Sequence, residues 1–175
     1  MRVIGGEFRS RRLKSIPGRD TRPTPDRLRE TLFDILGSRL EGAIFLDAYA
    51  GTGSVGIEAL SRGAARVIFI ERSKNAAVVI RENLASLGIT DRALLVRAAA
   101  TSALRNHAAD IVFLDPPYTR ETEYAAVLTA LGESPPPLVI VQHSVRFVPA
   151  ESYGSLRKTR TLKQGDNALA FYAPL

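Results

Sequence analysis

The tetrapeptide Asp115-Pro116-Pro117-Tyr118 places a carboxylate, two rigid prolines and an aromatic ring directly after the apolar run 111–114. An apolar run of this length predicts a buried strand, and the prolines end it because proline cannot donate a ladder hydrogen bond. Carboxylate and carbonyl oxygens can accept hydrogen bonds from an exocyclic amine while an aromatic ring stacks on the base that carries it. The tetrapeptide therefore predicts a site for an amine-bearing base. The alternative is a loop whose aspartate caps a turn and whose tyrosine covers the core.

A strand, a glycine-rich turn and a helix are predicted in succession over residues 43–62. The glycines Gly51, Gly53 and Gly56 let the backbone turn tightly and approach a ligand, and the start of the helix offers free N–H groups. Glu71 ends the next predicted strand, and an acid about 20 residues beyond such glycines typically binds ribose hydroxyls. The segment therefore predicts a nucleoside-binding loop, with a purely structural turn as the alternative.

The charge of Asp47 helps to choose the nucleoside. The glycine spacing also fits NAD, but a carboxylate beside the loop would repel a pyrophosphate and favour a ligand with an ammonium and a sulfonium, such as S-adenosyl-L-methionine (SAM). Asp47 could instead cap the turn. Methyl transfer to a base nitrogen accounts for both the glycine loop and the tetrapeptide, whereas hydride transfer accounts only for the loop.

The positive charge of the chain is concentrated at its N-terminus. Residues 1–29 contain nine Lys/Arg and three Asp/Glu, a net +6, and the other residues carry 15 charges of each sign. Such a basic segment is typical of a phosphate-binding arm, and a solvated tail is the alternative. Gly5-Gly6 and the apolar alternation around Phe8 and Leu13 favour a hairpin. We therefore expect the arm to contact RNA or DNA.

The composition fits one α/β domain over residues 1–175, with residues 1–22 as the basic arm. No apolar run is long enough for a membrane span or a signal peptide, so a cytoplasmic protein is expected. The chain has no cysteine, and its two histidines show no ligand spacing, so neither thiol chemistry nor a metal site is expected.

Strands alternate with helices along most of the chain, which predicts a mostly parallel sheet with helices on both faces and an antiparallel closing pair. Thr24-Pro25 is predicted to cap and open the first helix. The predicted strands are 43–48, 66–71, 93–97, 110–114, 138–141, about 154–162 and 167–173. The other predicted helices are 54–62, 73–87, near 101–106 and 121–132.

With these residues, the chain resembles the RsmD family of bacterial 16S ribosomal RNA (guanine-N2-)-methyltransferases. The matching segments are 3–13, 21–33 and 46–64, together with Glu71, Asn83 and residues 115–118. The resemblance implies a class I SAM-dependent methyltransferase (Rossmann-like) fold, with a seven-stranded sheet whose last strand is antiparallel. It also implies SAM as the cofactor and 16S ribosomal RNA as the partner, either naked or within a partly assembled small subunit.

The sequence departs from the family pattern at a few positions. Ala98–Ala100 stand where an acid usually contacts adenine, so that contact is expected from the backbone. Gln142 replaces a glutamate at the end of a strand, Gln164-Gly165 replaces Tyr-Gly, and Ser10 stands where glycine is common.

The expected site follows from these motifs and from the resemblance. The catalytic residues are expected to be Asp115, Pro116, Pro117 and Tyr118. Cofactor contacts are expected from Asp47, Ala50, Gly51, Thr52, Gly53, Glu71, Arg72 and Ala99. RNA contacts are expected from Arg9, Arg11, Arg12, Lys14, Arg22, Thr24 and Arg27. Two other functions stay open from the sequence, an adenine-N6 DNA methyltransferase and an RNA-binding ribosome-assembly factor without catalysis.

Overall fold

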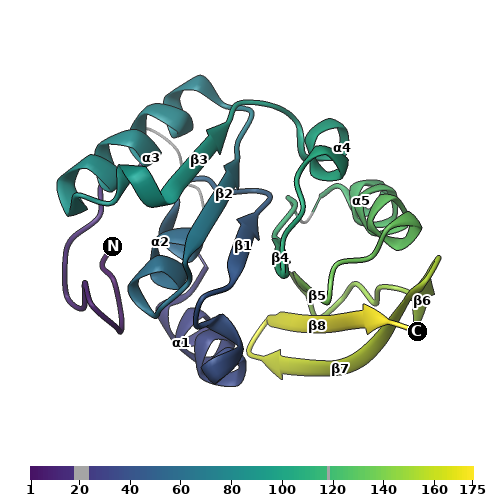
Figure 1. Ribbon diagram of the computed structural model, residues 1–175. Helices are drawn as coiled ribbons and strands as arrows, with labels where there is room; N and C mark the ends of the chain where they lie inside the picture. Colours follow the sequence, from purple (N-terminus) through teal and green to yellow (C-terminus); the bar gives the residue numbers. More distant parts are fainter. Residues whose placement is uncertain (18–23, 118) are drawn as a thin grey trace.

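The computed structural model describes residues 1–17, 24–117 and 119–175, and within them an eight-stranded sheet forms the middle layer (Figure 1). The strand order is β3-β2-β1-β4-β5-β8-β7-β6. Strands β1 to β5 are parallel, and β8 lies antiparallel between β5 and β7. The strands are β1 Ile44–Asp47, β2 Arg66–Ile70, β3 Ala93–Val96, β4 Ile111–Leu114, β5 Leu138–Ser144, β6 Ser152–Tyr153, β7 Leu156–Gln164 and β8 Asn167–Pro174.

Helices cover both faces of the sheet. Helices α1, α2 and α3 lie on one face, and α4 and α5 lie on the other (Figure 1). Within the described residues, no helix is both long enough and apolar enough to cross a membrane. The helices are α1 Asp26–Leu36, α2 Ser54–Ser61, α3 Lys74–Leu87, α4 Ala100–Ala103 and α5 Glu121–Glu133, with short 3₁₀ turns η1 Gly37–Leu40, η2 Thr90–Arg92 and η3 Leu104–Asn106.

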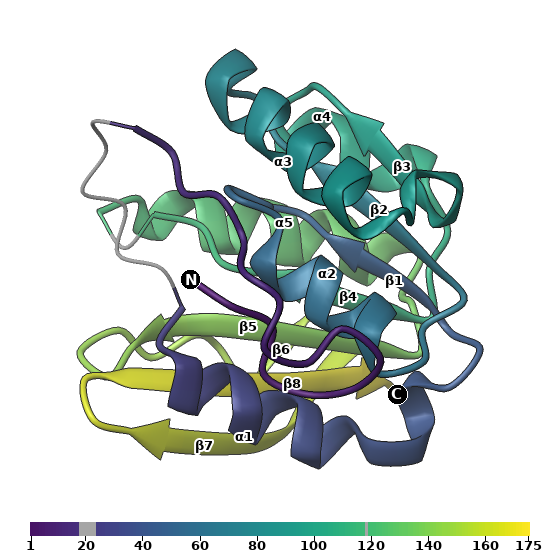
Figure 2. The ribbon, with the colours of Figure 1, turned by 90° about the vertical axis from the view of Figure 1, so that its left-hand side faces the viewer.

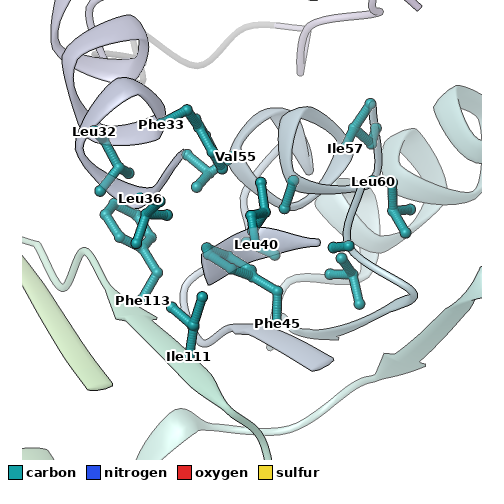
Figure 3. Packing of buried hydrophobic residues seen from close by; sticks show 14 of the residues in the cluster. Leu32, Phe33, Leu36, Leu40, Phe45, Val55, Ile57, Leu60, Ile111 and Phe113 are labelled. Atoms are coloured by element: carbon teal, nitrogen blue, oxygen red, sulfur yellow. The ribbon is translucent and has the colours of Figure 1, made fainter. Parts of the chain in front are cut away.

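The apolar strands bury side chains on both faces because each face is covered by helices. Phe45 of β1 packs in the cluster on the α1–α3 face, while its neighbour Leu46 packs in the cluster on the α4–α5 face. Figure 3 shows Leu32 and Leu36 of α1 packed against Phe113 of β4 in the first cluster. These two clusters hold the central strands in place, so the ends of those strands are rigid supports for a site.

The predicted fold class is confirmed, with two differences in detail. The sheet has an eighth strand, the two-residue β6, which pairs with the start of β7. Thr24 does not cap the first helix. Pro25 takes the N-cap position without a side-chain cap bond, and the hydroxyl of Thr24 hydrogen-bonds Gln142 Oε1 at 3.1 Å instead. A tertiary contact thus replaces the local cap that the sequence predicted.

Residues 1–17 form a hairpin-like segment, called here the N-terminal arm. It has one isolated antiparallel bridge, between Arg2 and Arg12, rather than two full strands. Its side chains Val3, Phe8 and Leu13 are buried in the core cluster of the α1–α3 face. The arm lies across α2, between α1 and α3 (Figure 2). A docked segment with buried apolar side chains is not a solvated tail.

Ser10 explains one departure from the family pattern. It has a φ of +69°, and within the described residues it is the non-glycine residue with a positive φ. This conformation costs an L-residue about 1 kcal/mol, whereas glycine adopts it freely. The turn of the arm therefore favours glycine at this position, and the serine is accommodated with strain.

The buried carboxylate of Glu58 on α2 fastens the arm to the domain. Its two oxygens accept the backbone N–H groups of Ile4, at 2.9 Å, and Gly5, at 2.8 Å. Arg62 Nε donates to the same carboxylate at 2.9 Å, and Arg29 Nε lies 4.0 Å from it. Glu58 and Arg29 have fully buried side chains. Arg29 also pairs with the exposed Asp26 at 3.1 Å, so Glu58 is its buried counter-charge, and removing one partner of a buried ion pair is costly.

We expect Glu58→Gln to lower the free energy of unfolding by about 3 kcal/mol, because Arg29 would lose its buried counter-charge. Asp34→Asn is the matched control, since Asp34 pairs with Arg62 on the surface with 68% of its side chain exposed. The control should cost less than about 1 kcal/mol. Urea unfolding measures both, and equal midpoints for the two variants would show that the Glu58 cluster does not fasten the arm.

Candidate active site

The carboxyl ends of the parallel strands border a cavity of about 960 Å³. Because parallel strands end at the same edge of a sheet, residues at or just beyond the ends of several strands lie together there. Residues 48–52 follow β1, Glu71 follows β2, and Asp115 follows β4. Two motifs that are more than 60 residues apart in the sequence therefore open into one cavity. Ala50, Gly51, Thr52, Glu71, Arg72, Ala99, Thr24, Asp115, Pro116 and Pro117, all predicted site residues, line it.

The glycine loop 50–53 turns tightly between β1 and α2. The N–H of Gly53 donates to the carbonyl of Ala50 at 2.7 Å, and Gly53 has a φ of +81°, which favours glycine. The next residue, Ser54, begins α2. The N–H groups of this helix start have no partners earlier in the helix, so this end suits a polar or anionic group.

Glu71 supports the loop as well as facing the cavity. One carboxylate oxygen accepts the N–H of Gly51 at 2.8 Å, and the other accepts the N–H of Ser73 at 2.7 Å. A carboxylate oxygen can accept more than one hydrogen bond, so both oxygens keep capacity for ribose hydroxyls. Glu71 therefore fixes the loop to the turn after β2 and is positioned for the predicted ribose contact.

Asp47 lies beneath the loop rather than among the side chains that line the cavity, and it is 1% exposed. Its Oδ2 accepts the N–H of Gly56 at 3.0 Å. A Cβ on Gly56 would lie 2.3 Å from Cε1 of Phe69, so only glycine lets α2 approach β2 this closely. The geometry gives Asp47 the task of holding α2, and direct contact with a cofactor stays a prediction.

Two carboxyl groups of the site hold their protons unusually tightly. Burial raises the pKa of Asp115 to about 7, and the nearby charge of Asp47 adds to the rise while a hydrogen bond from Thr24 opposes it. Burial also raises the pKa of Asp47 to about 7, assisted by the charge of Glu71 and opposed by the N–H of Gly56 and Tyr49.

The Asp-Pro-Pro turn is held by a residue of α5, on the α4–α5 face of the sheet. The hydroxyl oxygen of Tyr124 on α5 lies 3.1 Å from the carbonyl oxygen of Pro116 and 3.3 Å from that of Gln142, so its one proton is shared between these two acceptors. This carbonyl of Pro116, predicted to accept from the reacting amine, therefore keeps one lone pair for that purpose. Tyr118, the predicted stacking residue, lies outside the described residues.

Asp115, directly after β4, and Gln142 of β5 are neighbours, since Leu114 of β4 pairs with Val141 of β5. Both line the cavity, and the hydroxyl of Thr24 connects them to the start of α1. Thr24, predicted to contact RNA, is buried in this cluster. Its place indicates that it orients Asp115 and Gln142.

The predicted RNA-binding cations are spread along the arm and α1. Arg9, Arg12 and Arg27 are exposed and have no ion pair within the described ranges. The other two arm cations contact α3, with Arg11 donating to the carbonyl of Ser86 at 2.9 Å and Lys14 lying 3.2 Å from Glu82. Arg22 lies outside the described residues. The arm therefore presents free cations on the side of the domain that carries α1, α2 and α3.

Several cavity residues were not predicted from the sequence. Ile16 of the arm and Asn167, the first residue of β8, both line the cavity. Tyr49 lines it too, and its hydroxyl donates to Glu123 of α5 at 2.9 Å. The predicted antiparallel direction of the last strand was the one available signal, because it places the first residue of that strand at the carboxyl edge.

Comparison with known proteins agrees with this geometry. Residues 1–173 match the family described as "Conserved hypothetical protein 95". The chain is 37% identical to the Bacillus subtilis protein named "Putative rRNA methyltransferase YlbH", over 98% of both chains. It is 41% identical to ribosomal RNA small subunit methyltransferase D of Escherichia coli over 69% of this chain, a match that spans 61% of the Escherichia coli protein.

Solved structures show the same fold. The Escherichia coli structure described as "Putative methyltransferase yhhF" superposes with a TM-score of 0.85 at 33% identity, covering 99% of this chain and 97% of the other. A Salinibacter ruber RNA methyltransferase in complex with S-adenosyl-L-homocysteine has a TM-score of 0.67 at 19% identity, which shows the shared fold, over 87% of this chain and 94% of the other. A Synechocystis magnesium protoporphyrin IX methyltransferase of similar fold, at 15% identity and a TM-score of 0.68, holds bound SAM. The chain belongs to the RsmD family of methyltransferases.

Proposed function

We propose that this protein transfers the methyl group of SAM to the exocyclic N2 of a guanine in small-subunit ribosomal RNA, the guanine at position 966 of 16S RNA. The observation that carries the proposal is the one cavity shared by residues 50–52 of the glycine loop and Asp115. Two relatives are named as ribosomal RNA methyltransferases, which supports RNA as the substrate class. The exposed cations of the arm supply the phosphate contacts that such a substrate needs.

The residues of the cavity fit SAM. Glu71 and the loop 50–53 would hold the nucleoside and the amino-acid end, with Arg72 and Ala99 completing the wall. The nearby carboxyl groups of Asp47, Glu71 and Asp115 favour a cationic ligand over an anionic one such as a pyrophosphate. When bound, SAM supplies a methyl carbon to which the amine nitrogen bonds, while the electron pair of the broken C–S bond stays on sulfur and the amine loses a proton.

Asp115 orients the amine and accepts its hydrogen bond. The lone pair of the amine nitrogen is otherwise delocalised into the ring. A hydrogen bond to the ionised Asp115 concentrates electron density on this nitrogen, and the carboxylate can take up the released proton. The Pro116 carbonyl is the second acceptor, and Tyr118 is proposed to stack on the base, which is worth about 1–3 kcal/mol in single-stranded sites. Positioning supplies most of the acceleration, because well-oriented pairs reach effective molarities of about 10⁵ M or more. The target nucleotide must be unpaired or flipped out.

Nucleoside mass mapping of small-subunit RNA after incubation with enzyme and SAM tests the proposed function directly. We expect one added methyl group on a guanine, located on N2. N6-methyladenine in DNA substrates would instead favour an adenine-N6 DNA methyltransferase. SAM binding without any methylation of transcript or isolated subunits would favour an assembly factor.

The protonation of Asp115 predicts the pH dependence of the reaction. Only the ionised carboxylate can take up the proton that the amine loses, and the pKa of Asp115 is raised to about 7, so kcat/KM should fall as the pH drops below about 7 and level off above it. Asp115→Asn should lower kcat by about 10²-fold or more while leaving SAM binding within a few-fold. Methylation of the identified RNA between pH 5.5 and 9 measures both effects. Near wild-type turnover in Asp115→Asn would exclude this role.

The exposed cations of the arm predict a salt-dependent RNA affinity. Replacing Arg9 and Arg12 with alanine should weaken RNA binding and flatten the plot of log affinity against log salt by up to about two units, a little under one per lost phosphate contact. The matched control replaces Arg105 and Arg157, two exposed arginines outside the arm. Filter binding at several salt concentrations distinguishes the pairs, and an unchanged slope for the arm variant would assign RNA contact to another surface.

A further inference from the structure

Asn83 of α3 joins the N-terminal arm to the cofactor loop through its side-chain amide. Its Oδ1 accepts the backbone N–H of Lys14 at 2.7 Å, and its Nδ2 donates to the carbonyl of Lys14 at 3.2 Å. The same Nδ2 donates to the carbonyl of Thr52, inside the loop, at 3.0 Å. One side chain therefore touches the backbone of both segments.

The amide suits this position because of its donors and acceptor. Asn83 is 1% exposed, and its hydrogen bond to Thr52 is buried, whereas its two bonds to Lys14 are partly buried. Two carbonyls and one N–H surround the side chain, and an asparagine offers two N–H donors and an acceptor oxygen to match them. An aspartate would face the two carbonyls without a donor, and an alanine would leave the backbone groups of Lys14 and Thr52 without these partners.

Other contacts of the arm meet the same part of the cavity. Ile16 packs against Ala76 and Val79 of α3 and also lines the cavity. The hydroxyl of Thr52 hydrogen-bonds Sδ of Met1 at 3.6 Å. The arm is thus part of the wall beside the loop, and the position of one affects the position of the other.

We propose that Asn83 is a positioning residue that couples RNA binding on the arm to cofactor binding on the loop 50–53. This inference rests on the proposed function, in which Arg9 and Arg12 contact RNA phosphates. RNA that holds the arm in its docked position also holds Lys14, and through Asn83 it holds the carbonyl of Thr52. The loop then loses less conformational entropy when the cofactor binds. Each ligand therefore raises the affinity of the protein for the other by the same factor.

The test measures the affinity for S-adenosyl-L-homocysteine, which binds without turnover, in the absence and presence of saturating, unmodified small ribosomal subunits. For the wild-type protein we expect affinity about tenfold tighter with subunits, within the usual range of such coupling. In Asn83→Ala, the affinity with subunits divided by the affinity without them should lie within about twofold of one. Glu82→Gln is the matched control, because it removes the neighbouring Lys14–Glu82 ion pair and leaves the bridge to Thr52 intact.

The ratio separates coupling from a general loss of structure. A merely structural role for Asn83 would weaken binding equally with and without subunits and leave the ratio at its wild-type value, which would overturn the inference. If subunits bind the wild-type protein without changing its affinity for S-adenosyl-L-homocysteine, the inference is overturned too, while the proposed function stands. Subunits that do not bind at all would contradict both.

Hydrogen exchange of the wild-type protein gives a second measurement that needs no variant to fold. Subunit binding should slow exchange of the N–H groups of residues 51–54 even without cofactor. Unchanged exchange in this loop, with slowed exchange in the arm, would show that docking of the arm is not transmitted.

Discussion

Helix α2 lies so close to β2 that there is no room for a side chain at Gly56, and this contact sets the position of everything around it. A Cβ there would lie 2.3 Å from the ring of Phe69, while Asp47 accepts the N–H of the same glycine. The start of α2 follows directly from the glycine loop 50–53, so fixing the helix fixes the loop. The far side of the helix carries Glu58, whose buried carboxylate holds the arm. One short helix thus positions both the proposed cofactor site and the proposed RNA-binding segment.

The parallel direction of the strands brings the other residues of the site together. Because β1, β2, β4 and β5 all run the same way, Glu71, Asp115 and Gln142 meet at one edge although they are far apart in the sequence. Burial in this shielded site raises the pKa values of Asp115 and Asp47. The arrangement favours a cationic methyl donor. It also places the pKa of Asp115 near neutral pH, which suits the proposed role of this carboxyl group as a proton acceptor.

Local patterns were sufficient to predict much of this. The Asp-Pro-Pro turn and the glycine loop each follow an apolar run, and a strand that ends at a fixed residue determines where the next side chain points. Thr24 was mispredicted as a cap because its hydroxyl bonds Gln142, a residue 118 positions away. Ile16 and Asn167 went unnoticed for the same reason: their part in the cavity depends on how the arm and β8 pack, which no local signal encodes. Asn83 stood out only through the family resemblance, and its hydrogen bonds to two distant segments gave it a role.

The central claim is that the glycine loop and the Asp-Pro-Pro turn serve one reaction in one cavity. A crystal structure with bound S-adenosyl-L-homocysteine tests it most directly. The account predicts the ribose hydroxyls on Glu71, the amino-acid end at residues 50–53, and the sulfur on the side of the cavity that Asp115 borders. A ligand whose sulfur faces away from Asp115, or one bound outside this cavity, would contradict the account.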